Sequence, residues 1–331
     1  MNINTNKISS FLQEENKHII FNYLSPKFLI KNNLEFLIDV PIPFGENEHD
    51  ISTLDISFNM ARILGADPNF PYLKQYQIYF EKIFGNNALK AFMSFGTKMA
   101  DEKKCAVAMM IFRCILLLDE ENKNGMYLYA RICMDIYNLE SQKADLGDEE
   151  LIGSLKAEAL KYFEKLTMIY KEFSKPYYFL GYLYLNLGLY NKAKLTWEEF
   201  LKLNYEGENV RPQNEEIIER LKSLKEPVNI ENAINFILRG DYEQGLSILN
   251  KYTESEFSSW WPLWFYLGEA KMGQGEFKEA SDYYIKALKY SPSNIDIMEK
   301  LVMIFQNTGD REKEKKYQNK INIINENLNR E

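Results

Sequence analysis

Side chains that could carry out acid, base or metal chemistry are few in this chain of 331 residues, which has two histidines, His18 and His49. Glu14 lies four residues before His18, so a helix there would place both on one face. Two such ligands do not make a metal site. Residues 45–50 contain three carboxylates beside His49, and we expect them to form a solvated polar loop rather than a cation site. No metal-binding residues are predicted.

Nucleophilic chemistry is also not indicated. The three cysteines, Cys105, Cys114 and Cys133, show no metal-binding or redox spacing, and they fall on apolar helical faces where we expect them to be buried. The sequence contains no glycine-rich phosphate loop, and no serine or cysteine has the context of a catalytic motif. We therefore predict that the chain is not an enzyme, has no catalytic residues and takes no cofactor.

A helix–turn–helix spacing at residues 264–292 is the most informative pattern. Gly268 and Ala280 are small, which would let two helices cross closely. Gly275 falls in the turn, where a positive φ is often needed. Pro292 ends the second helix, because proline lacks an N–H and clashes with the preceding turn. The large side chains that would fill the space between the helices are Trp264, Leu267, Phe277 and Tyr284.

This spacing resembles the tetratricopeptide repeat, a unit of about 34 residues. The same spacing recurs upstream at Tyr177, Leu180, Gly181, Tyr184, Gly188, Tyr190, Ala193 and Trp197. Turn glycines at Gly240, Gly275 and Gly309 lie 35 and 34 residues apart. Weaker matches extend the resemblance to about six units of bacterial type over residues 89–325. It implies an all-α protein, an α-solenoid of antiparallel helix pairs (the tetratricopeptide superhelix) with an N-terminal helical cap.

Four segments are predicted. Residues 1–88 form an N-terminal helical capping region with an extended proline-containing segment, for which a separate functional domain is the alternative. Residues 89–207 form a first repeat block, residues 208–226 an inserted helix, and residues 227–331 a second repeat block with a C-terminal capping helix. The insertion follows from the 52 residues between Gly188 and Gly240, which exceed one repeat period.

Local signals refine the irregular parts. Residues 7–24 suggest a helix, and the prolines in residues 40–43 favour an extended backbone. Ser52 is expected to cap a helix that Gly65 ends, and Pro71 suits the first turn of the next helix. Ile217, Leu221 and Leu224 have helical spacing in the inserted helix, and residues 138–150 resemble a lengthened turn.

The charge balance argues against two classes of partner. The chain has 48 acidic and 40 basic residues, mixed along its length, and a net charge of −8. Non-specific binding of nucleic acid or of anionic membranes requires clustered Lys and Arg, so we expect neither. No apolar run approaches the roughly 20 residues of a membrane span. The first residues do not resemble a secretion signal, so a cytoplasmic location is expected.

The resemblance also implies where a partner would bind, because the first helix of each tetratricopeptide unit lines the concave groove. The corresponding positions, with their neighbours in the groove, are Tyr127, Arg131, Tyr178, Phe179, Tyr182, Asn186, Phe265, Tyr266 and Glu269. Aromatic side chains give a large contact area at low entropic cost. The alternative is that several of them pack inside the protein. Residues 260–262 (Trp-Trp-Pro) are a second candidate for an anchor.

The sequence therefore predicts a protein–protein or protein–peptide interaction module that binds a partner segment in an aromatic concave groove. Two alternatives stay open. One is a cytoplasmic regulator that senses a peptide, and the other is a cytoplasmic chaperone for a secreted or assembled partner.

Overall fold

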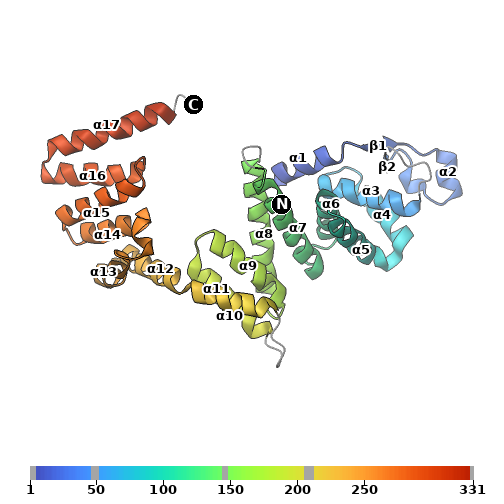
Figure 1. Ribbon diagram of the computed structural model, residues 1–331. Coiled ribbons are helices and arrows are strands. Elements are labelled where there is room, and N and C mark those ends of the chain that lie inside the picture. Colours follow the sequence, from blue (N-terminus) through green and yellow to red (C-terminus); the bar gives the residue numbers. More distant parts are fainter. Residues whose placement is uncertain (1–4, 46–51, 144–147, 205–211, 329–331) are drawn as a thin grey trace. The chain divides into compact units, whose positions relative to one another are not determined.

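The computed structural model describes residues 5–45, 52–143, 148–204 and 212–328, and almost all of them are helical (Figure 1). The first half contains α1 (Thr5–Glu15), α2 (Pro26–Lys31), α3 (Thr53–Ala66), α4 (Leu73–Phe84), α5 (Ala88–Asp101), α6 (Cys105–Leu118), α7 (Lys123–Ser141) and α8 (Glu149–Ile169). It is followed by α9 (Ser174–Asn186), α10 (Tyr190–Asn204), α11 (Pro212–Ser223), α12 (Lys225–Leu238), α13 (Tyr242–Leu249), α14 (Trp261–Gly273), α15 (Phe277–Tyr290), α16 (Ile295–Thr308) and α17 (Arg311–Leu328).

The chain divides into two compact units. One comprises Met1–Leu183 with Glu199–Tyr205, and the other comprises Tyr184–Glu198 with Glu206–Glu331. The division passes through α9 and α10. Within each unit, consecutive helices pack as pairs, among them α5 with α6, α7 with α8, α14 with α15 and α16 with α17. The predicted all-α architecture of antiparallel helix pairs is confirmed.

The turn glycines have the backbone conformation that the repeat spacing predicts. Gly188, Gly240, Gly275 and Gly309 adopt φ values of 70°, 88°, 79° and 76°, which residues with a Cβ rarely adopt. Each of them ends the first helix of a pair or lies in the turn directly after it. The regular spacing of these glycines in the sequence therefore marks the turns of repeated helix–turn–helix units.

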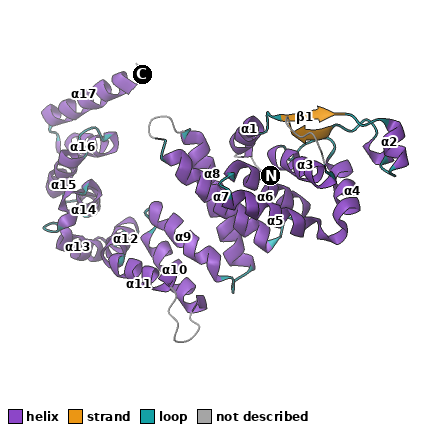
Figure 2. Ribbon diagram, turned by 45° about the vertical axis from the view of Figure 1, so that its right-hand side comes forward, coloured by secondary structure: helices purple, strands orange, loops and turns teal. Residues whose placement is uncertain are grey.

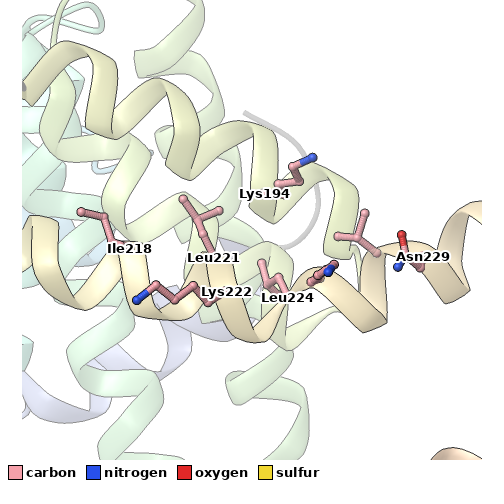
Figure 3. Close-up of a pocket in the computed structure, with 8 residues that line it drawn as sticks. Lys194, Ile218, Leu221, Lys222, Leu224 and Asn229 are labelled. Carbon is pink, nitrogen blue, oxygen red and sulfur yellow. The ribbon is translucent and has the colours of Figure 1, made fainter.

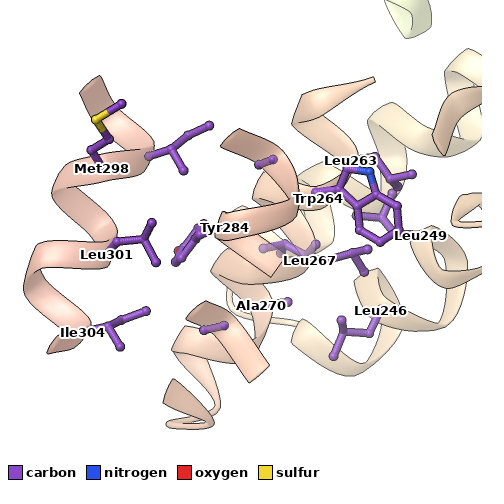
Figure 4. Close-up of a cluster of buried hydrophobic side chains, with 14 of the residues drawn as sticks. Leu246, Leu249, Leu263, Trp264, Leu267, Ala270, Tyr284, Met298, Leu301 and Ile304 are labelled. Carbon is purple, nitrogen blue, oxygen red and sulfur yellow. The ribbon is translucent and has the colours of Figure 1, made fainter. Parts of the chain in front are cut away.

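The core of the second unit is built from the small and large residues of the repeat pattern (Figure 4). A Cβ added at Gly268 would lie 2.7 Å from Cε1 of Tyr284, so α14 and α15 cross as closely as the sequence predicts. Ala280 and Tyr284 are fully buried. Trp264 packs in the same cluster and its indole N–H donates to the carbonyl of Ser258 at 2.7 Å.

A two-stranded sheet replaces part of the helix predicted at residues 7–24. Helix α1 ends at Glu15, and β1 (Ile19–Asn22) pairs antiparallel with β2 (Ile42–Gly45), as Figure 2 shows. That helix prediction is wrong over its second half because Ile19, Ile20 and Phe21 form a short apolar run, which suits a strand as well as a helix. The extended conformation predicted at residues 40–43 is confirmed over β2, and Pro43 pairs with Phe21 in a sheet that has only edge strands in the described residues.

Helix α3 begins as predicted but does not end as predicted. Ser52 is its N-cap, in a capping box with Asp55. Gly65 lies inside the helix rather than after it, and Asp67 is the C-cap. A Cβ at Gly65 would lie 1.8 Å from the carbonyl oxygen of Met110 in α6. Glycine is therefore required here by the close approach of two backbones, not by a helix terminus. Similarly, Pro71 precedes α4 rather than lying in its first turn.

Helix α1 contacts α3 of the N-terminal region and α6 and α8 of the first repeat block. Ile8 and Leu12 are fully buried at these contacts. The Lys7 ammonium lies 2.9 Å from a carboxylate oxygen of Asp148 and 3.3 Å from one of Glu150, at the start of α8. Residues far apart in the chain thus hold the N-terminal helix in place. The capping role of residues 1–88 stays a prediction.

The two irregular stretches of the repeat array differ in how they are built. The predicted turn at residues 138–150 is shorter than expected, because α7 continues to Ser141 and α8 begins at Glu149. Its residues 144–147 lie outside the described residues. Helix α11 lies in the stretch of the predicted insertion, with Ile217 buried, whereas Leu224 is buried at the N-cap of α12.

The cysteines give a simple test of the packing. Cys114 and Cys133 are buried, and burial raises the pKa of both thiols, whereas Cys105 is half-exposed. Because the thiolate is the reactive form, we expect iodoacetamide at about pH 8 to modify Cys105 well before the other two. Peptide mass spectrometry over time measures the rates, and all three should react alike in denaturant. Equal rates in the native protein would contradict this packing of α6 and α7.

Candidate functional site

An aromatic cluster in the first unit contains three of the predicted groove residues. The Arg131 guanidinium carbon of α7 lies 4.0 Å from the ring centroid of Phe179 in α9. Phe179 in turn stacks on Phe163 of α8, with centroids 5.7 Å apart and planes 16° apart. Tyr127 joins them, and its partial burial raises the pKa of its hydroxyl while Arg131 acts in the opposite direction. Tyr127, Arg131 and Phe179 remain half-exposed, so this cluster combines packing with an accessible surface.

Tyr178 and Tyr182 lie side by side on α9, with ring centroids 5.3 Å apart. Tyr178 also contacts Phe200 of α10, with centroids 5.5 Å apart. Phe200 is 2% exposed, so the ring that stands at the small position of the repeat pattern is accommodated in the core. Both tyrosines are half-buried. Tyr178 therefore has a packing role in addition to any role in binding.

Glu269 belongs to a partly buried polar network of the second unit. Its carboxylate accepts a hydrogen bond from the Tyr284 hydroxyl and lies 2.9 Å from the Lys300 ammonium. Burial, followed by this carboxylate, raises the pKa of Tyr284. The network connects α14, α15 and α16, so Glu269 is engaged within the protein. Asn186 is exposed at the C-terminal end of α9.

A recess of about 430 Å³ in the second unit contains the other two predicted groove residues, Phe265 and Tyr266. Trp260 and Trp261 line the same recess, and the rings of Trp261 and Phe265 meet edge to face with centroids 6.0 Å apart. Tyr190 lines it from the start of α10. Residues 260–262, the second candidate for an anchor, therefore lie in the same recess as the predicted groove residues Phe265 and Tyr266. We call this surface the aromatic recess.

The aromatic recess lies on the first helices of successive pairs. Phe265 and Tyr266 belong to α14, Ile230 and Ile234 line the recess from α12, and Asp296 lines it from the first turn of α16. Helices α12 and α14 contact each other directly. The sequence analysis missed Ile230 and Ile234, although their spacing of four residues on a first helix is the same signal that marks Tyr178 and Tyr182.

The charged groups of the aromatic recess are acidic. Glu231 and Asp296 line it, whereas no Lys or Arg does so in the part of the chain that the structure describes. Glu231 accepts a hydrogen bond from the backbone N–H of Asn191 at 2.7 Å, which fixes its carboxylate. The recess can therefore surround an apolar group and attract a positive charge at its edge.

Other kinds of site are not found in the described residues. Within them, no three His, Cys, Asp or Glu side chains are grouped so that they could hold a metal ion. His18 lies in the turn after α1, so the expectation that it shares a helical face with Glu14 is wrong. The loop at residues 46–51, with His49, lies outside the described residues. No helix in the described ranges has the length and apolarity needed to cross a membrane.

Comparisons with known proteins agree with the repeat spacing. Tetratricopeptide repeat models match residues 174–206 and residues 261–294. No curated protein sequence matches the chain significantly. The chain therefore contains tetratricopeptide repeats at these two places, and repeats of this family generally bind proteins or peptides.

Similar solved structures include several repeat proteins. The P58(IPK) TPR domain is 19% identical, with 69% of this chain and 58% of that chain covered and a TM-score of 0.39. A tetratricopeptide repeat protein from Parabacteroides merdae is 15% identical, with 97% of both chains covered and a TM-score of 0.32. MamA from Desulfovibrio magneticus is 18% identical, with 60% and 93% covered and a TM-score of 0.28. The family assignment rests on the two matched repeats rather than on these structures.

Proposed function

We propose that this chain is an interaction module that binds a polypeptide segment of a partner protein in the aromatic recess. The observation that carries the proposal is that Trp260, Trp261, Phe265 and Tyr266, at the start of α14, line one recess together with residues of the first helices α12 and α16. Aromatic residues in partly desolvated recesses contribute most of the energy of many protein interfaces. Trp260 is 36% exposed, so its ring offers contact area that the fold leaves uncovered.

The chemistry of the recess indicates which segment it accepts. The rings and the Ile230 and Ile234 side chains favour an apolar or aromatic side chain of the partner. Glu231 and Asp296 favour a Lys or Arg next to it and disfavour an acidic segment. An interaction module with these properties recognises a partner by a short apolar and basic stretch.

Substituting Trp260 tests the proposal. A partner is first isolated by affinity purification from the source cells, and its dissociation constant is then measured by calorimetry. We expect Trp260→Ala to weaken binding at least about tenfold, because an interface anchor contributes about 2 kcal/mol or more and 1.4 kcal/mol is a factor of ten. The matched control is Tyr290→Ala, which removes a ring that is 41% exposed on α15 and outside the recess.

Two results decide between the recess and the first unit. Unchanged affinity in a stable Trp260→Ala, Phe265→Ala double variant would rule out the recess as the anchor. The double variant Tyr178→Ala, Tyr182→Ala should then lose affinity instead. Its melting temperature must be measured as well, because Tyr178 packs on Phe200 and its truncation is expected to lower stability.

A further inference from the structure

The inserted helix α11 forms a second surface, separate from the aromatic recess. A cleft of about 450 Å³ lies where α10, α11 and α12 meet (Figure 3). Its apolar lining consists of Ile218, Leu221, Leu224 and Val228. None of its lining residues is shared with the aromatic recess. We call this surface the lysine cleft, after the charged residues described next.

Helix α11 leaves apolar side chains uncovered on the side of the cleft. Ile217 is fully buried and anchors the helix, whereas the adjacent Ile218 is 42% exposed. Figure 3 shows Leu221 extending from α11 towards the helix that carries Lys194. Leu224 and Val228 are buried, so Ile218 and the half-buried Leu221 are the apolar groups of the cleft that a partner could cover.

Among the described residues, the charged side chains that line the cleft are Lys194, Lys222 and Lys225, all basic. Lys194 lies 3.8 Å from Glu198 and Lys222 lies 3.1 Å from Glu219, each on its own helix, and all four side chains are exposed. Exposed pairs of this kind are weak, so both ammonium groups remain available to a partner. The chain as a whole has a net charge of −8, whereas the described residues that line the cleft include three lysines and no Asp or Glu.

We infer that the lysine cleft docks an acidic amphipathic segment of a partner polypeptide, in which apolar side chains are flanked by Asp or Glu. The apolar side chains would cover Ile218 and Leu221, and the carboxylates would pair with Lys222 and Lys225. This charge preference is opposite to that of the aromatic recess, where Glu231 and Asp296 favour basic residues. The protein would thus have two docking surfaces that discriminate between segments by sign of charge.

A defined peptide tests this inference without knowledge of the natural partner. The probe is a fluorescein-labelled peptide of about 12 residues, three helical turns, made of leucines and glutamates in helical amphipathic order. Fluorescence anisotropy measures its binding to the full chain. We expect the double variant Lys222→Glu, Lys225→Glu to weaken binding at least about tenfold, since two attractions become repulsions. The control is Lys251→Glu, Lys278→Glu, two exposed lysines outside the cleft, which should change affinity less than about twofold.

Four results would overturn the inference. Equal affinity for a peptide with glutamine in place of glutamate would show that the cleft does not recognise the negative charge of the peptide. Equal affinity of the Lys222→Glu, Lys225→Glu variant, or no binding to the unaltered chain, would reject the cleft as an acidic docking site. Trp260→Ala should leave peptide binding unchanged, so a loss there would place the peptide in the aromatic recess. The proposal for the aromatic recess is tested separately, by the affinity of the isolated partner for the Trp260→Ala variant.

Discussion

The Gly65→Ala variant is expected to destabilise the first unit by about 3 kcal/mol, the upper end of the usual cost of overpacking. The added Cβ would lie 1.8 Å from the carbonyl oxygen of Met110, and a backbone atom cannot rotate away as a side chain can. Relief requires α3 and α6 to separate along their contact. Urea unfolding followed by circular dichroism measures the change.

Gly153→Ala is the matched control for this variant. Gly153 lies in α8 and is exposed, and a Cβ there would meet nothing within 4 Å. Alanine in a helix interior is favoured over glycine by about 0.5–1 kcal/mol, so this control should stabilise the protein slightly. The same chemical change therefore has opposite signs at two positions. A Gly65→Ala protein as stable as the unaltered chain would show that α3 and α6 do not approach so closely.

Leucine at Gly268 is expected to destabilise the second unit by more than about 2 kcal/mol. Its Cβ alone would lie 2.7 Å from the Tyr284 ring, which is fully buried and has its hydroxyl bound to Glu269. The ring therefore has no free space into which it can turn. Thermal unfolding measures the loss, and Gly153→Leu serves as a control for the effect of leucine in an open position. A melting temperature equal to that of the unaltered protein would place Gly268 away from the helix crossing.

The repeat helices could be predicted from the sequence because their signals are local. Gly275 marks a left-handed turn, and Gly268 and Ala280 mark a crossing within one helix pair. Gly65 could not be assigned in this way, because its contact with Met110 joins residues far apart in the chain. From the sequence alone, a glycine near the end of a helical pattern is interpreted as the end of the helix. The position of the neighbouring backbone is needed to recognise a close contact between helices. Strand β1 was missed for a related reason. It forms a sheet only by pairing with β2, which lies further along the chain.

The candidate site was predictable only in part. The positions of Phe265 and Tyr266 follow from the repeat pattern, and residues 260–262 were noted for their tryptophans. Asp296 was not foreseen, because it reaches the recess from the next helix pair. Glu269 occupies a groove position in the pattern, yet the structure bonds it to Lys300, 31 residues away. Spacing within one repeat identifies which side of a helix a residue is on, but neighbouring repeats determine whether it is free.

The docking of α1 has a consequence for how the chain folds during synthesis. Repeat proteins commonly fold by adding neighbours, since each unit contacts only the next. Helix α1 departs from this rule, because Ile8 and Leu12 are buried and Lys7 pairs with Asp148 and Glu150. Its contacts with α8 can form only after α8 has left the ribosome, and such long-range contacts slow folding. The contacts of α1 with α3 and α6 can form earlier, so α1 joins helices of the first unit that are synthesised at different times.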